Sequence, residues 1–233
     1  MALTIKHIDL GGVNCYLGKE EDQYVLFDTG GYMILDKNLD NRRALLKRVL
    51  YENGCNKENL KLLVLTHGDI DHVANAQYLR EQYGLKIAMH KGDLKLVQNP
   101  KVEDMMESFN YRSIAFKVIM SFMKTKIRKV MQKTLDAFET FTPDILLKEG
   151  DTLQAYGFDA KIFSLPGHTA GSIGILTSNN ELIAGDLFQN NKHLGVAMNA
   201  IDFENLDKSA KRIEDMKTKA IYAGHGTPWV RKE

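Results

Sequence analysis

The stretch THGDIDH, residues 66–72, places two histidines and two aspartates within six consecutive positions. It directly follows LKLLVL, residues 60–65, an apolar run with the length of a buried strand. So many ligand-type side chains at the end of a strand are costly unless a cation compensates their charge, and a divalent metal ion does so well. The competing interpretation is a surface turn, because Asp and Gly are common in turns. By itself the stretch favours metal binding.

Three later segments place a further candidate ligand beside a glycine at the end of an expected strand. They are SLPGHTAGS with His168, LIAGDLF with Asp186, and IYAGHGTPW with His225. Glycine lets the backbone approach closely, so each side chain can turn into a crevice at the carboxyl end of its strand. His168 alone would be interpreted as a loop histidine and Asp186 alone as a turn residue. Together with THGDIDH they predict one cluster.

The rest of the chain has the pattern of a layered α/β protein. Apolar or alternating runs bounded by turn residues predict strands at 3–10, 13–18, 24–28, 60–65, 85–90, 144–151, 151–156, 159–165, 172–178, 181–186 and 220–226. Helical spacing predicts helices at 38–53, between residue 73 and Gly84, at 91–97 and at 203–217. We expect a single domain over residues 1–233, with a helical insertion at about 100–142.

The expected insertion has a composition of its own. Residues 101–141 contain no Gly or Pro and hold five of the ten methionines, and residues 111–133 carry several Lys and Arg but no Asp or Glu. One interpretation is a helix packed on the body of the protein with a solvated basic face. The alternatives are a lid or wall over the metal site with an adaptable methionine pocket, a membrane-surface helix, or a dimer interface.

The motifs, in this order, resemble the metallo-β-lactamase superfamily and its glyoxalase II-like metal-dependent hydrolases. The hallmark of that family is HxHxDH, followed by a lone histidine in a GHT loop, an aspartate after a strand and a last histidine. In this sequence Asp69 stands at the second histidine of HxHxDH. Asp28, in FDTG at 27–30, matches the family's first motif, an acidic residue that orients the metal loop. The resemblance implies an α/β fold of the four-layer αββα sandwich type.

The resemblance also implies two divalent metal ions at one edge of the sandwich. The side chains that match the family's ligands are His67, Asp69 and His168 for one ion, Asp71, His72 and His225 for the other, and Asp186 as the bridge between them. A hydroxide that bridges the ions would be the nucleophile, with Asp71 and Asp186 as the catalytic carboxylates. We therefore expect a hydrolase that acts on a small ester, thioester, lactone or related substrate.

Asp69 leaves the identity of the metal open, because a carboxylate is a harder ligand than imidazole and adds a negative charge. Zinc is the first expectation, with iron and manganese as alternatives. The flavodiiron branch of the family also carries a carboxylate at this position. One alternative function is therefore a di-iron redox enzyme that works with a separate flavoprotein, and another is a non-catalytic metal-binding module.

The net charge and the first residues of the sequence limit the kinds of partner and the location that we expect. The formal net charge of +1 argues against a dedicated nucleic-acid binder. The first residues lack the pattern of a signal peptide and no apolar run is long enough to span a bilayer, so we expect a cytoplasmic protein. We find no counterpart of the C-terminal helical region with which glyoxalase II enzymes bind glutathione. A small-molecule substrate is expected, and a homodimer and a membrane contact through the basic helix stay open.

Overall fold

Two six-stranded sheets form the centre of the protein. The computed structural model describes residues 3–34, 36 and 39–232. In spatial order, the first sheet contains β1 (Thr4–Asp9), β2 (Asn14–Glu20), β3 (Gln23–Phe27), β4 (Leu60–Val64), β5 (Lys86–His90) and β6 (Ile145–Leu147). The second contains β12 (Trp229–Val230), β11 (Ala220–Gly226), β9 (Glu181–Asn190), β8 (Ile173–Thr177) and β7 (Ala160–Ser164), with β10 (Gly195–Val196) paired to β9.

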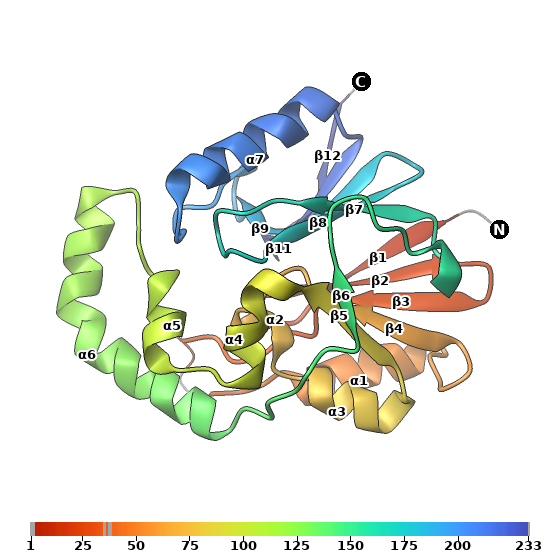
Figure 1. Ribbon diagram of the computed structural model, residues 1–233, viewed down its shortest axis with the longest axis horizontal. Coiled ribbons are helices and arrows are strands. Elements are labelled where there is room, and N and C mark those ends of the chain that lie inside the picture. The colour runs from red at the N-terminus through yellow and green to blue at the C-terminus, as the bar shows by residue number, and fades with distance from the viewer. Residues whose placement is uncertain (1–2, 35, 37–38, 233) are drawn as a thin grey trace.

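Helices cover the outer faces of both sheets. The helices are α1 (Arg43–Glu52), α2 (Ile70–Val73), α3 (Ala76–Tyr83), α4 (Leu94–Gln98), α5 (Val102–Glu107), α6 (Ile114–Asp136) and α7 (Phe203–Met216). Helices α1 and α3 lie against the first sheet and α7 lies against the second, which makes the expected four layers (Figure 1). Within the described residues no helix is long and apolar enough to cross a membrane.

The alternation of side chains along β4 shows how the layers are held. Leu62 and Val64 are fully buried between the sheets, in one cluster with Ile175 of β8. Leu63 lies in the cluster on the other face, with Leu50 of α1. Successive side chains of a strand point to opposite faces, so this apolar run is buried on both sides. The position of the following residues, 66–72, is fixed as a consequence.

The helix expected at 38–53 is shorter than predicted. It begins at Arg43, and its expected start at Asn38 lies outside the described residues. Arg42 has a φ of 61°, which no helix interior accepts, and its buried guanidinium donates to the carbonyls of Gly31 and Asp40 at 2.8 and 2.7 Å. Tertiary hydrogen bonds of one arginine therefore override the helical pattern before residue 43.

Two further expectations need correction. Residues 151–156 do not form a strand: Thr152 makes a single bridge to Lys161, and Gln154–Tyr156 is a 3₁₀ turn that ends at Gly157 with a φ of 69°. The single helix expected from residue 73 to Gly84 is split into α2 and α3. The reason lies in Asn75 between them, whose buried amide donates to the carbonyl of Asn41 at 2.8 Å and to that of Thr29 at 3.1 Å.

The segment expected as a helical insertion contains α5 and α6. Only the second half of α6 packs firmly, through Ile127 and Met131, which belong to the core cluster of the first sheet. The first half leans away from the body at the edge of the molecule (Figure 1) and leaves Phe122 87% exposed.

Hydrogen bonds from two side chains of β2 to one carbonyl of β11 connect the two sheets next to the site. The buried hydroxyl of Tyr16 in β2 donates to the carbonyl of Ala223 in β11 at 2.5 Å, and the Asn14 amide donates to the same carbonyl at 2.9 Å. Ala223 lies two residues before His225. The contact therefore sets the distance between β11 and the first sheet.

Replacing Tyr16 with Phe should lower the free energy of unfolding by about 1 kcal/mol, because a buried hydrogen bond is lost. Urea denaturation followed by circular dichroism would measure it. Tyr51→Phe is the control, since that ring is 81% exposed. Equal stability of the two variants would contradict the role given to Tyr16.

Candidate metal centre

Seven ligand-type side chains from separate parts of the chain meet at one edge of the sandwich. The structure brings together all of the candidates that the sequence singled out: His67, Asp69, Asp71, His72, His168, Asp186 and His225. The first four lie on the loop and short helix after β4, and His168 lies between β7 and β8. Asp186 and His225 come from the neighbouring parallel strands β9 and β11.

Two of these side chains lie inside strands, as the expected ranges 181–186 and 220–226 predict, and one of the strands is longer than expected. β9 continues past Asp186 to Asn190, and β11 includes His225. Their register shifts between Tyr222 and His225, and Gly185 has a φ of 50°. This local irregularity turns both side chains toward the loop after β4 without ending either strand.

The glycines before these ligands are required by close packing. A Cβ on Gly224 would lie 1.9 Å from the Asp186 carboxylate, and one on Gly185 would lie 2.6 Å from the Thr66 hydroxyl. The expectation that glycine allows close approach at these two positions is confirmed.

The side chains form two groups of three. In the first, the Asp69 carboxylate lies 3.1 Å from His168 Nε2 and 3.9 Å from His67 Nε2. In the second, the Asp71 carboxylate lies 3.5 Å from His225 Nε2 and 3.9 Å from His72 Nε2. Each group offers three ligand atoms within 4.8 Å of one another.

Asp186 lies between the two groups. Its carboxylate is 3.1 Å from His225 Nε2 and 3.4 Å from His72 Nε2 on one side, and 3.7 Å from His168 Nε2 on the other. The side chain is almost fully buried. One carboxylate therefore faces both groups at once.

Each of the four histidines uses its Nδ1 atom for a contact away from the cluster. The partners are Thr66 Oγ1 for His67 at 2.9 Å, Asp28 for His72 at 3.0 Å, the Asn199 carbonyl for His168 at 3.1 Å and the Gly12 carbonyl for His225 at 2.6 Å. Histidines that bind metals almost always donate their second ring nitrogen in this way. When Nδ1 donates and the imidazole is neutral, its Nε2 turns a lone pair toward the cluster.

The donor set fits divalent cations. Ligand atoms about 2.0–2.2 Å from a tetrahedral ion lie roughly 3.4 Å apart. The carboxylate-to-Nε2 distances within the two groups, 3.1–3.9 Å, lie around this value. The atoms His67 Nε2, His72 Nε2 and Asp186 Oδ1 are buried and have no hydrogen-bond partner among the described residues. Buried polar atoms without partners are expensive, and a bound cation would satisfy all three.

The charges of the cluster depend on one another. Burial, helped by the neighbouring His72, lowers the pKa of His67 to about 4. Burial also works against protonation of His168 and His225, but the carboxylates beside them outweigh it and raise the pKa of each to about 9. Burial would raise the pKa of Asp186, yet His225 and His72 hold it well below its usual value. Without a cation, the histidines supply the positive charge that these carboxylates need.

Asp28 links the loop to the cluster. Its carboxylate accepts from the Thr66 amide and hydroxyl, both at 2.8 Å, and from His72 Nδ1. The Thr66 hydroxyl is thereby free to accept from His67. Asp28 itself has a φ of 59°, so this orientation comes at some backbone cost.

Asp93 was not singled out from the sequence and holds the two ligand loops together. Its buried carboxylate accepts from the Gly68 amide at 2.8 Å, the Gly171 amide at 2.7 Å and the Thr169 hydroxyl at 2.6 Å. Gly68 lies beside Asp69, and Thr169 follows the candidate ligand His168. The available signal was the sequence HKGD after β5, since polar residues at the end of a parallel strand face the site edge.

Comparisons with known proteins identify the family of the chain. The protein-family model of the metallo-beta-lactamase superfamily matches residues 8–225. The hydroxyacylglutathione hydrolase GloC of Haemophilus influenzae is 30% identical over 180 residues, which are 72% of this chain and 70% of that protein.

Solved structures show the same fold. A metallo-beta-lactamase family protein of Thermus thermophilus superimposes with a TM-score of 0.69 at 20% identity, and the match covers 98% of this chain and 74% of that protein. A second structure, of a protein in a di-iron-bound form, has a TM-score of 0.66 at 21% identity, and the match covers 97% of this chain and 94% of that one.

Replacing Asp93 with Ala should lower the free energy of unfolding by about 2–4 kcal/mol, because two buried amides lose their acceptor. Chemical denaturation of the metal-free protein would measure it. Asp151→Ala is the control, since its carboxylate caps one amide at the surface. A loss no larger than that of the control would contradict the linking role of Asp93.

Proposed function

The chain belongs to the metallo-β-lactamase superfamily, and from this premise we propose that its cluster holds two metal ions and hydrolyses a small ester, thioester, lactone or related substrate. Members of the superfamily are mostly hydrolases and typically bind two metal ions. The observation that carries the proposal is the convergence of four Nε2 atoms, each with its Nδ1 engaged elsewhere, on three carboxylates.

The proposed ligand sets follow the two groups. His67, Asp69 and His168 would hold one ion, and Asp71, His72 and His225 the other. Asp186 would contact both, because its Oδ2 atom lies near His168 of the first group and near His225 of the second. When bound, the ions would lower the pKa of a water molecule and polarise the substrate carbonyl.

The protein supplies access and a proton acceptor. A cavity of about 380 Å³ reaches the cluster and is lined there by Asp69, Asp71, His168, Asp186 and His225. His67 and His72 are more deeply buried and do not line it. Asp71 is the carboxylate that we assign to accept the proton of the attacking water and return it to the leaving group, with Asp186 orienting the reacting groups.

Membership of the superfamily fixes neither the substrate class nor the identity of the metal. The name of the Haemophilus relative puts thioesters first among the substrates to test. Asp69 makes iron and manganese alternatives to zinc, and the di-iron-bound structural neighbour supports including iron. A di-iron redox enzyme would show two irons per chain and no hydrolytic turnover.

Purified protein should contain two divalent ions per chain by inductively coupled plasma mass spectrometry, and His168→Ala should contain fewer because the first group loses a ligand. Removal of the metal by a chelator should abolish hydrolysis, and adding zinc, iron or manganese back should restore it. Turnover that survives complete metal removal would overturn the proposal.

Asp186→Asn should lower kcat/KM for a thioester by at least about a hundredfold while circular dichroism stays unchanged, because its carboxylate serves both groups. Asp136→Asn is the matched control, since that carboxylate lies on the exposed side of α6 and, among the described residues, accepts only from Gln132. Comparable activity of Asp186→Asn and the control would reject the role of Asp186.

A further inference from the structure

We propose that the acyl part of the substrate is an uncharged aliphatic chain that lies along α6, in the cavity that opens onto the cluster. That the reacting bond lies at the cluster is part of the proposed function, on which this inference rests. The identity of the chain rests on separate observations, namely the shape, lining and charge of the cavity wall.

The cavity continues from the cluster to α5 and α6. It is lined both by His168, Asp186 and His225 of the cluster and by Met105, Met120 and Met123 of α5 and α6. A substrate whose carbonyl lies at the cluster must therefore place one of its substituents against the methionines. Of the alternatives for the 100–142 segment, a wall over the site is the one that this lining supports.

The wall is adaptable and apolar. Methionine side chains are unbranched and polarisable, so they fit flexible chains of different conformation. Ile127 and Met131, which anchor α6 in the core, form the floor of the same cavity. Ile119 lines it as well although it is 52% exposed. An aliphatic chain entering the cavity would remove this apolar surface from water.

Charge excludes other kinds of chain. The acidic and histidine side chains among the described lining residues all belong to the cluster, and none of these residues is Lys or Arg. The exposed lysines of α6, such as Lys117 and Lys124, are not among its lining residues. A carboxylate or phosphate on the acyl chain would therefore find no counter-charge among the described lining residues, and its burial there would carry a large cost.

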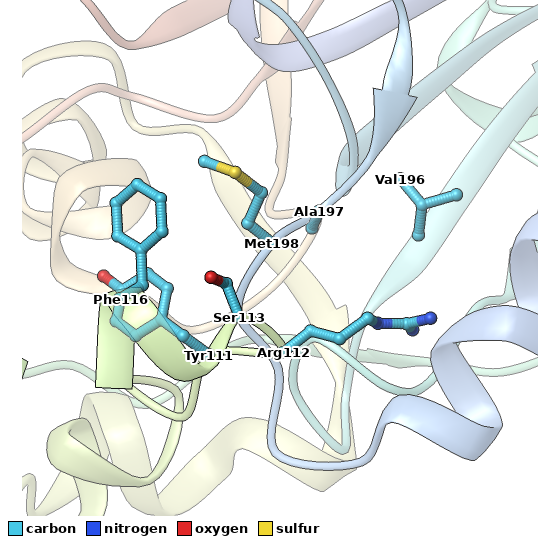
Figure 2. A pocket seen from close by; sticks show the side chains of 7 residues that line it. All are labelled: Tyr111, Arg112, Ser113, Phe116, Val196, Ala197 and Met198. Carbon is cyan, nitrogen blue, oxygen red and sulfur yellow. The ribbon is translucent and has the colours of Figure 1, made fainter. Parts of the chain in front are cut away.

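Two aromatic side chains also line the cavity. The rings of Tyr111 and Phe116 stack at 5.7 Å with an angle of 19° and line both this cavity and a second hollow of about 460 Å³. Figure 2 shows the two rings together on one side of that hollow, while Arg112 extends to the other side toward Val196. The Arg112 guanidinium pairs with Asp207 at 2.7 Å. It is therefore engaged away from the aromatic pair.

The first test uses the metal-loaded full-length chain and 4-nitrophenyl esters from acetyl to decanoyl. We expect kcat/KM to rise about three- to fourfold per methylene until the chain meets the aromatic pair, and then to level off. The monoester of suberic acid, which has the length of octanoyl with a terminal carboxylate, should react at least about tenfold more slowly than octanoyl. A flat length series, or a suberoyl ester as fast as octanoyl, would overturn the proposal.

Substitutions on α6 test whether its methionines cause the dependence of kcat/KM on chain length. Met120→Gln combined with Met123→Gln should lower the octanoyl-to-acetyl ratio of kcat/KM at least about tenfold, because polar amides would face the chain. Phe122→Gln is the matched control on the same turn, since Phe122 is exposed and does not line the cavity. An equal drop in both variants would assign the effect to the helix as a whole and reject the cavity.

A binding measurement separates this inference from the proposed function. Methyl ketones have no hydrolysable bond, and isothermal titration should show tighter binding of the octyl than of the propyl compound. Tighter binding together with no hydrolysis of any ester or thioester would support the aliphatic site and reject the hydrolase. Ester hydrolysis with no dependence on length in either assay would leave the hydrolase standing and reject the aliphatic site.

Discussion

The structure depends on one electrostatic constraint: three carboxylates and four imidazoles share a buried site at the edge of two sheets. The negative charges of Asp69, Asp71 and Asp186 repel one another within this cluster. In the absence of a cation, protonated histidines compensate, as the raised pKa of His168 and His225 indicates. A pair of divalent ions would do the same with the imidazoles neutral.

Much of the nearby architecture serves to keep these groups at fixed positions. Two further buried carboxylates, Asp28 and Asp93, each accept three hydrogen bonds and connect segments that are distant in the sequence. Asp28 orients the loop after β4, and Asp93 joins that loop to the one that carries His168. Because these backbone amides are bonded to the two carboxylates, neither loop can shift without leaving a buried donor unpaired.

The site joins two regions of opposite chemistry. Its inner end is charged and tightly hydrogen-bonded, whereas the wall formed by α5 and α6 is apolar and built from flexible side chains. The charged cluster suits the polar bond that reacts, and the apolar wall suits an apolar substituent of that bond. None of the seven side chains of the cluster comes from α6, because the cluster is held by the sheets and by the loops after β4 and β7. The same sandwich could therefore serve other substrates if the wall changed.

The sequence by itself predicted the strands and the candidate cluster, because apolar runs and glycine next to a ligand-type residue are local patterns with a direct physical meaning. The four-layer sandwich and the two ligand sets were implied by the resemblance to a family. Tertiary structure alone decided the rest. The carbonyls of Gly12 and Asn199 that orient His225 and His168 are backbone groups, which carry no residue signal. Arg42 and Asn75 interrupt helical patterns through bonds to distant carbonyls. The direction in which α6 faces depends on where Ile127 and Met131 meet the core, so only the folded chain shows that its methionines line the path to the cluster.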